Sequence, residues 1–180
     1  MPLFIIPGSL VSALTFPGVI VHEAAHLFFC RRHRVAVFDV CFFRFGNPAG
    51  YVIHEPTNDF RVSFAISLGP FLINSLVCVL ICSAAFLPVG VLDLRAGGHM
   101  VFYWLGLSIG MHAFPSSQDL ANVKELRPAA AKQGDLLAKV SAPLLGLLGI
   151  LDLARFIWAD YLYGLAIGVL LPLVVFKAIV

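Results

Sequence analysis

Residues 62–92 read VSFAISLGPFLINSLVCVLICSAAFLPVGVL, a run that contains no Asp, Glu, Lys or Arg. A transmembrane helix needs about 20 consecutive apolar residues, so this run is long enough to cross a bilayer. The whole chain has a similar character, because 60% of its 180 residues are hydrophobic, 12% are charged and its mean hydropathy is +0.94. This composition is typical of a multi-span membrane protein. The net charge of +2 is too small to indicate a nucleic-acid partner.

Further apolar intervals lie on both sides of this run. The sequence predicts a single all-α polytopic membrane domain over residues 1–180, with about five transmembrane helices in the lipid bilayer. In the first of them, Pro17 and Gly18 either kink one helix or end a re-entrant piece. The fourth contains Lys139, Asp152 and Arg155. The predicted spans are residues 2–30, 62–92, 96–118, 136–158 and 161–176.

The basic residues indicate an orientation, because Lys and Arg accumulate on the cytoplasmic side of membrane proteins. With five spans and the amino terminus outside, all twelve Lys and Arg residues except Arg95 and Arg155 fall inside. We therefore expect a multi-pass protein of the cell membrane. The residues expected inside are Arg31, Arg32, Arg34, Arg44, Arg61, Lys124, Arg127, Lys132, Lys139 and Lys177.

Two segments between the spans have a different character. Residues 35–54 are rich in β-branched and aromatic types around the turn signal Asn47-Pro48-Ala49-Gly50, which predicts a small membrane-associated β-hairpin on the cytoplasmic side. Residues 116–134 are polar and predict a helix at the inner face that Pro128 interrupts or restarts.

The motif His22-Glu23-Ala24-Ala25-His26 lies in the first predicted span. Residues four apart share a helix face, so the two imidazoles can bind one Zn²⁺ ion while Glu23 stands beside it as a catalytic base. A charged residue at membrane depth is costly unless it is paired or lines a wet cavity, so Glu23 indicates function. The alternative is a pair of buried histidines that bind backbone carbonyls and no metal.

A catalytic zinc site needs a third protein ligand. Asp119 follows the end of the third predicted span, at the depth expected for His26, and is the candidate. The alternative for Asp119 is a helix N-cap, since Ser116, Ser117 and Asp119 are all favourable capping types. His112 either replaces it as a ligand, donates a hydrogen bond to a ligand or is a buried structural histidine.

These motifs resemble the site-2 protease family of intramembrane zinc metalloproteases. The resemblance rests on His22 to His26, on Gly69-Pro70 followed by Asn74, and on Ala113-Phe114-Pro115 leading to Asp119, in the family's order. It implies that His22, His26 and Asp119 bind zinc, that Glu23 is the base, and that Asn74 contacts substrate or an oxyanion. An interhelical hydrogen bond is the alternative for Asn74. The family usually has Gly where this chain has Leu120.

The sequence thus predicts a zinc-dependent endopeptidase, with one Zn²⁺ per chain, that cleaves a membrane-protein substrate within or near the bilayer. Its catalytic core covers about residues 10–130, its additional carboxy-terminal helices cover about residues 136–180, and its active site faces the cytoplasm. The alternatives are a membrane metal-binding protein, such as a transporter or sensor, and an inactive scaffold that captures transmembrane segments.

Overall fold

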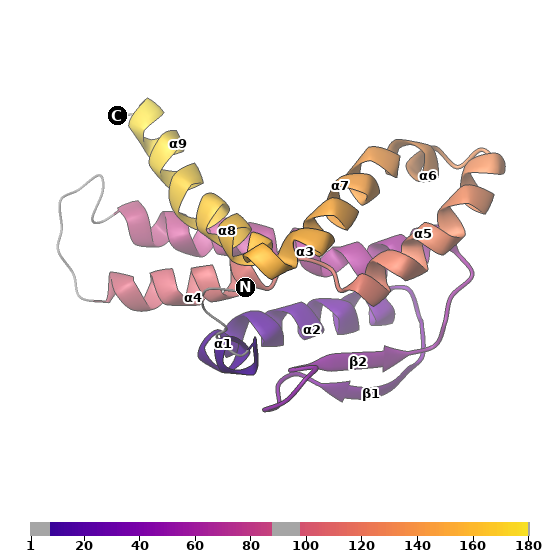
Figure 1. The fold of residues 1–180 in the computed structure, drawn as a ribbon, viewed down its shortest axis with the longest axis horizontal. Coiled ribbons are helices and arrows are strands. Elements are labelled where there is room, and N and C mark those ends of the chain that lie inside the picture. Colours follow the sequence, from indigo (N-terminus) through magenta and orange to yellow (C-terminus); the bar gives the residue numbers. More distant parts are fainter. Residues whose placement is uncertain (1–7, 88–97, 180) are drawn as a thin grey trace.

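The computed structural model of the chain describes residues 8–87 and 98–179. These residues are mostly helical and include one two-stranded antiparallel sheet (Figure 1), which confirms the expected helical chain with a small hairpin. In chain order the described elements are α1 (Gly8–Leu14), α2 (Phe16–Arg32), β1 (Val37–Cys41), β2 (Tyr51–His54), α3 (Phe60–Phe86), α4 (His99–Met111), α5 (Ser117–Lys132), α6 (Leu136–Val140), α7 (Ala142–Leu153), the 3₁₀ turn η2 (Ala154–Ile157), α8 (Ala159–Leu165), the π-helical stretch η3 (Ala166–Leu170) and α9 (Leu171–Ile179).

Two described helical stretches are long and apolar enough to cross a membrane, Phe60–Phe86 and Ala159–Ala178. Two other apolar helices, α4 and α7, are shorter. The start of the first predicted span, the end of the second, the start of the third and Arg95 lie outside the described residues.

The long helix α3 lies at the centre of the fold. Its amino terminus is capped by Asp59, whose carboxylate accepts hydrogen bonds from the backbone N–H groups of Arg61 (2.7 Å) and Val62 (3.2 Å). Its 27 residues extend over about 40 Å at the usual helical rise. The positions of the other elements follow from the part of α3 that each one contacts.

The carboxy-terminal half of α3 packs against α4 and against the continuous stretch from α8 to α9. Helix α4 runs antiparallel to α3 and approaches it closely at Gly110, where a Cβ would lie 2.6 Å from the Cys78 sulfur. The stretch from α8 to α9 runs parallel to α3. It ends where the rings of Phe86 and Phe176 stack with centroids 5.5 Å apart.

The amino-terminal half of α3 packs against α2 on one side and against α5 and α6 on the other, and α7 packs against α5 and α6. Arg61 Nε donates a hydrogen bond to Asp135 Oδ2 at 2.6 Å, and this ion pair lowers the pKa of Asp135. Helix α5 continues through Pro128 without a break, so the expected interruption there is wrong. The apolar side chains that fill this half are Phe60, Leu68, Leu120, Val123, Ala138, Leu145 and Leu148.

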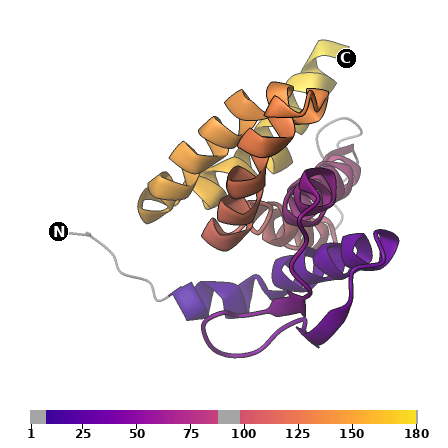
Figure 2. The same ribbon diagram turned by 90° about the vertical axis from the view of Figure 1, so that its right-hand side faces the viewer.

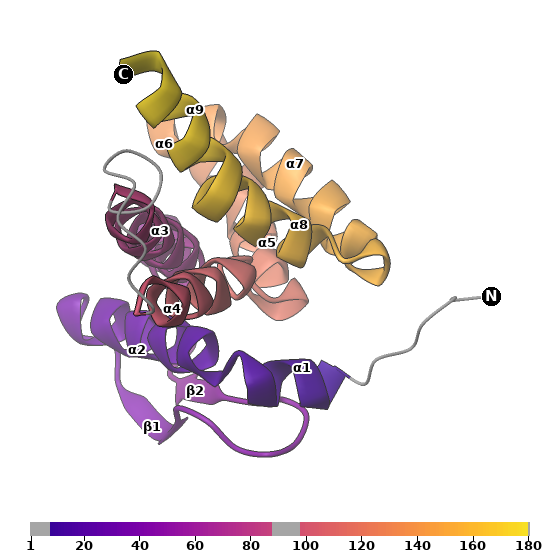
Figure 3. The same ribbon diagram turned by 90° about the vertical axis from the view of Figure 1, so that its left-hand side faces the viewer.

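The two strands form an antiparallel hairpin beside α2, with Val37 opposite His54 and Cys41 opposite Tyr51. The connecting segment covers residues 42–50, which is longer than the predicted four-residue turn. Viewed from the two ends of its long axis, the molecule is layered: the hairpin, then α1 with α2, then α3 with α4, then α5 to α9 (Figures 2 and 3).

Three breaks between helices meet near the middle of α3. They are Thr15 between α1 and α2, residues 112–116 between α4 and α5, and residues 154–158 between α7 and α8. The first two are joined by Thr15 Oγ1 and His112 Nε2 at 2.8 Å. Figure 1 shows α7 and α8–α9 diverging from the third break. Only α3 runs past this level as one uninterrupted α-helix within the described residues.

These breaks change the expected arrangement of spans. The segments predicted as a fourth and a fifth span together run along α3 once, from the Arg61–Asp135 pair to the Phe86–Phe176 stack. Lys177, expected on the same side as Arg61, therefore lies near the opposite end of α3. Arg155, expected near the outer side, lies at the middle level.

Candidate metal centre

His22 and His26 lie on one face of α2, as their spacing predicts. Their Nε2 atoms are 3.2 Å apart, and their rings meet edge to face. Helix α2 approaches α4 closely at Gly18, because a Cβ there would overlap the backbone carbonyl of Ser108. This approach brings the His22 ring to the end of α4.

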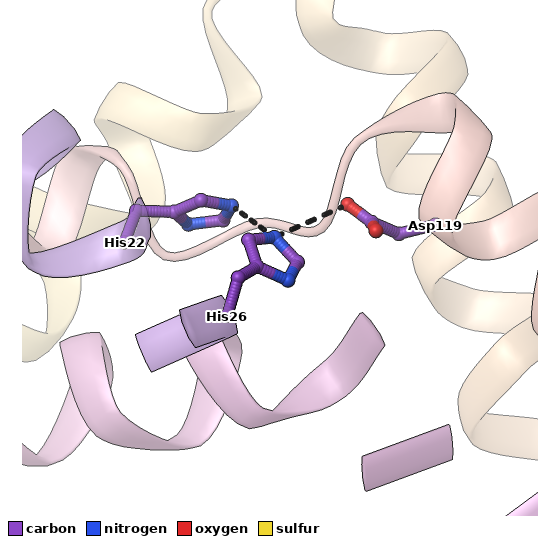
Figure 4. A group of neighbouring side chains, drawn as sticks. All are labelled: His22, His26 and Asp119. Atoms are coloured by element: carbon purple, nitrogen blue, oxygen red, sulfur yellow. Dashed lines mark hydrogen bonds and ion pairs between the residues drawn. The ribbon is translucent and has the colours of Figure 1, made fainter. Parts of the chain in front are cut away.

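Asp119 completes the cluster from α5. Its Oδ2 atom lies 3.6 Å from His26 Nε2, and the ligand atoms of His22, His26 and Asp119 all lie within 4.8 Å of one another (Figure 4). The three residues predicted as zinc ligands are therefore brought together.

Asp119 also takes part in capping the amino terminus of α5, but it is not the N-cap residue. Ser116 is the N-cap of α5, and Asp119 is the third helical residue of a reciprocal capping box. Asp119 Oδ2 accepts hydrogen bonds from the backbone N–H (2.9 Å) and the hydroxyl (2.6 Å) of Ser116. Asp119 is therefore not the N-cap itself, as the alternative interpretation expected, but the residue that pairs with the N-cap Ser116. The capping box fixes the carboxylate where it faces His26.

Hydrogen bonds behind the rings decide which nitrogens can bind a metal. His22 Nδ1 lies 2.7 Å from the backbone carbonyl oxygen of His112. A carbonyl oxygen can only accept, so Nδ1 carries the proton, and Nε2 of the neutral ring presents a lone pair to the cluster. The backbone of Ile66 is the corresponding partner of the His26 ring. Because His26 Nε2 faces the cluster, we infer that Nδ1 is the nitrogen directed at the Ile66 carbonyl.

Pro70 explains why the Ile66 carbonyl is free to accept. In a regular helix the carbonyl of residue 66 would bind the N–H of residue 70, but proline has no N–H. Pro70 lies inside α3 and is fully buried. The Gly69-Pro70 pair therefore has a local effect on the site. Gly69 admits the ring of Phe29 from α2, and Pro70 leaves a backbone acceptor for His26.

The cluster consequently holds acceptor atoms without a donor between them. With both rings protonated at Nδ1, two imidazole lone pairs and the Asp119 carboxylate face one point, which is unfavourable unless a cation occupies it. Zinc binds imidazole nitrogen at about 2.0–2.1 Å in tetrahedral geometry, which separates neighbouring ligand atoms by about 3.3 Å. The separations of 3.2 Å and 3.6 Å around His26 Nε2 are close to this spacing, whereas the His22 and Asp119 ligand atoms are placed only within 4.8 Å of each other. The donor set of two imidazoles and one carboxylate also suits zinc.

His112 supports this cluster through its backbone. Its carbonyl oxygen holds His22, whereas its ring Nε2 is paired with Thr15. The Thr15 hydroxyl donates to the Val11 carbonyl at 2.7 Å, so it accepts the proton from His112 Nε2. Of the roles that the sequence left open for His112, the bond of its ring to Thr15 fits a structural histidine, and the atom that contacts His22 is its backbone carbonyl.

Asn74 lies outside the cluster and has no exposed surface. Its Nδ2 group donates to the carbonyl oxygens of Gly18 (3.3 Å), Ile109 (3.1 Å) and His112 (3.1 Å). The interhelical hydrogen bonds expected as the alternative are therefore present and join α2, α3 and the end of α4. Contact of Asn74 with a substrate stays a prediction.

Glu23 is buried beside His22 and borders a cavity of about 700 Å³. The cavity extends from His22 and Glu23, between the connecting segment of the hairpin and the start of α8. Gly50 closes over Glu23 so tightly that a Cβ on it would lie 2.7 Å from Glu23 Cγ. The cavity leaves room for a substrate next to the carboxylate. Residues lining it include His22, Glu23, residues 46–50, His112, Ser116 and Arg155.

Sequence reasoning missed the contribution of the carboxy-terminal helices to this site. Arg155 donates to the carbonyl oxygens of Phe114 (3.2 Å) and Pro115 (2.9 Å), in the segment between His112 and Asp119. The signal was a charged pair, Asp152 and Arg155, inside an otherwise apolar stretch. Comparison of the chain with protein-family models, with curated proteins and with solved structures found no match.

Proposed function

We propose that this protein is an intramembrane zinc endopeptidase of the site-2 protease type, which hydrolyses a peptide bond of a membrane-protein substrate. One observation carries the proposal: the ligand atoms of His22, His26 and Asp119, from two helices distant in the sequence, lie within 4.8 Å of one another. They converge as acceptors, and Glu23 and a cavity lie beside them.

The bilayer is the proposed environment because α3 and the stretch from α8 to α9 are long and apolar enough to cross it. Basic residues gather where α2 ends and α3 begins, at Arg31, Arg32 and Arg61. By the positive-inside rule this end faces the cytoplasm. The other half-length helices complete a bundle whose breaks line the cavity, as irregular backbone at membrane depth requires. The active site would then open toward the cytoplasmic face.

The proposed chemistry assigns one task to each polar group. A zinc ion held by the three ligands would polarise the scissile carbonyl and lower the pKa of a water molecule. Glu23 accepts a proton from that water as its oxygen attacks the carbonyl carbon, and transfers the proton to the leaving amine nitrogen as the C–N bond breaks. The carbonyls of His112 and Ile66 hold the two imidazoles in the required tautomer. The free edge of the hairpin offers main-chain hydrogen bonds to an unwound substrate segment.

The test combines metal analysis with proteolysis. Purified wild-type protein should contain one zinc ion per chain and should cleave members of a pool of single-span membrane peptides labelled at both ends. The Glu23→Gln variant should keep the zinc and lose about 10²–10⁴-fold in cleavage rate. Glu55→Gln, on an exposed residue after the hairpin, is the matched control and should cleave normally.

Each contrary result points to one of the other functions. Zinc bound by the wild-type protein without cleavage of any peptide in the pool would favour a metal-binding protein. Peptide capture without bound metal would favour an inactive scaffold. Full activity in Glu23→Gln would reject the mechanism.

A further inference from the structure

Arg155 lies in the third break, between α7 and α8, at the vertex seen in Figure 1. Its surroundings in the sequence are apolar, so a guanidinium here needs partners. Two of them are successive backbone carbonyls, Phe114 at 3.2 Å and Pro115 at 2.9 Å, both bound by Nη2. A third is Asp152, whose Oδ1 lies 3.3 Å from Nη1. The planar fork of arginine suits this set of acceptors, whereas lysine offers a single point charge.

The bound carbonyls belong to a buried segment. Ala113 is fully buried, Phe114 is 6% exposed and Pro115 is fully buried. Buried carbonyls need hydrogen-bond donors. Side chains from three elements provide them. His22 of α2 and Asn74 of α3 donate to the His112 carbonyl, and Arg155 of η2 donates to the carbonyls of Phe114 and Pro115.

This segment carries both halves of the metal centre. Its first residue, His112, presents the carbonyl that orients His22. Its last residue, Ser116, is the N-cap that orients Asp119. The two carbonyls held by Arg155 lie between them. A shift of the segment would therefore change the distance between the histidine and the carboxylate.

Asp152 links the same arginine to α5. Besides its ion pair with Arg155, it accepts a hydrogen bond at Oδ2 from the Ser117 hydroxyl at 2.8 Å. Ser117 is the first residue of α5, two positions before Asp119. Arg155 and Asp152 together thus hold the segment before α5 and the first turn of α5 itself.

We propose that Arg155, oriented by Asp152, is a positioning residue of the metal centre: it fixes the segment 112–116 so that His22 and Asp119 present their ligand atoms to one ion. The inference rests on the proposed function for the identity of the ion. It gives the carboxy-terminal helices a part in the site, in place of an accessory role beside a core that ends near residue 130.

The experiment compares Arg155→Lys and Asp152→Asn with Arg61→Lys, which alters the other arginine–aspartate pair without touching the segment. The first readout is amide hydrogen exchange of residues 112–119 in metal-free, folded protein. We expect about tenfold faster exchange in both test variants, since Arg155→Lys loses hydrogen bonds to the segment and Asp152→Asn loses the charge that orients Arg155. The second readout is the dissociation constant for Zn²⁺, which should rise about 10–100-fold in the test variants and stay unchanged in Arg61→Lys.

The two readouts separate the two proposals. Wild-type protein that binds no zinc would contradict the proposed function, whereas the exchange rates would still report on the segment. Unchanged exchange in residues 112–119 in Arg155→Lys and Asp152→Asn would overturn the positioning role. If the wild-type protein binds zinc, faster exchange in the two test variants without a change in their zinc affinity would also overturn the positioning role. If Arg155→Lys does not fold, the Asp152→Asn variant, which keeps the arginine, decides by the same criteria.

Discussion

Asn74 and His22 donate hydrogen bonds to the same atom, the carbonyl oxygen of His112, at 3.1 Å and 2.7 Å. The amide of Asn74 also holds carbonyls of α2 and α4. The residue that joins the three helices is therefore the one that fixes the acceptor behind His22. Helix packing and the orientation of the His22 ring therefore both involve the Asn74 side chain.

Replacing Asn74 with leucine keeps the approximate size and removes the donor. We expect a loss of about 1–3 kcal/mol in stability from the unsatisfied carbonyls and zinc binding about 10–100-fold weaker. Thermal unfolding and zinc titration measure the two effects. If Asn74 instead contacts substrate, KM should rise while zinc affinity stays at the wild-type value.

Pro70→Ala should affect stability and metal binding in opposite directions. The new N–H at residue 70 would bind the Ile66 carbonyl within α3, so the helix should be as stable as before or more stable. His26 would lose its partner, and zinc affinity should fall by about tenfold or more. Pro128→Ala, on an exposed proline inside α5, is the control and should leave zinc binding unchanged. Equal zinc affinity in both variants would contradict the assigned role of Pro70.

Asp119 should show graded effects. Asp119→Asn can still accept hydrogen bonds from Ser116 but lacks the negative charge, so zinc occupancy at limiting metal should fall between wild type and Asp119→Ala. Both variants should be nearly inactive. Asp135→Ala removes an N-cap of α6 and should cost about 0.5–2 kcal/mol without loss of zinc. Full zinc occupancy in Asp119→Ala would limit Asp119 to the capping box.

Two glycines provide a matched test of the approach of α2 to α4. Gly18→Ala should reduce both folded yield and zinc affinity, because the methyl group overlaps the Ser108 carbonyl and pushes His22 away from His112. At Gly146 of α7 an added Cβ meets no described atom within 4 Å outside the helix's own nearby backbone. Gly146→Ala should therefore be neutral or slightly stabilising. Wild-type behaviour of Gly18→Ala would show that α2 and α4 lie farther apart than described.

The position of the carboxy terminus tests the number of crossings. If α3 crosses the bilayer, reporters fused after Arg34 and after Lys132 should both be cytoplasmic, and a reporter fused after Ala178 should be external, because α9 ends beside Phe86. Five complete spans predict the cytoplasm for all three. A cytoplasmic reading after Ala178 would therefore contradict the single passage of residues 136–179 along α3.

The sequence was sufficient for the parts of the fold and site that depend on local spacing. The pairing of His22 with His26 follows from helical periodicity, and the hairpin follows from its composition and turn signal. Asp119 could be singled out because few carboxylates lie at the end of an apolar stretch. Its exact capping role could not, since serine and aspartate are both good capping types and only the backbone geometry decides between them.

The broken helices could not be derived in the same way. A half-length helix and a full span have the same apolar composition. Residues 136–158 and 161–176 therefore each predict a crossing, although in the structure the two segments together extend only once over the length of α3. The role of Arg155 was also hidden, because its acceptors are main-chain carbonyls, which every residue possesses. For the same reason the sequence pointed to the imidazole of His112, whereas the atom that binds His22 is the backbone carbonyl oxygen of His112.

The position of Arg155 late in the chain has a consequence for biosynthesis. A ribosome produces His22, His26 and Asp119 before it reaches residue 155, so a nascent chain holds all three ligands while the segment between His112 and Ser116 still lacks its carbonyl donor. On the proposed role of Arg155, His22 and Asp119 reach their final geometry only when residue 155 has been translated and packed against residues 114 and 115. The proposed protease activity would therefore be absent from shorter nascent chains.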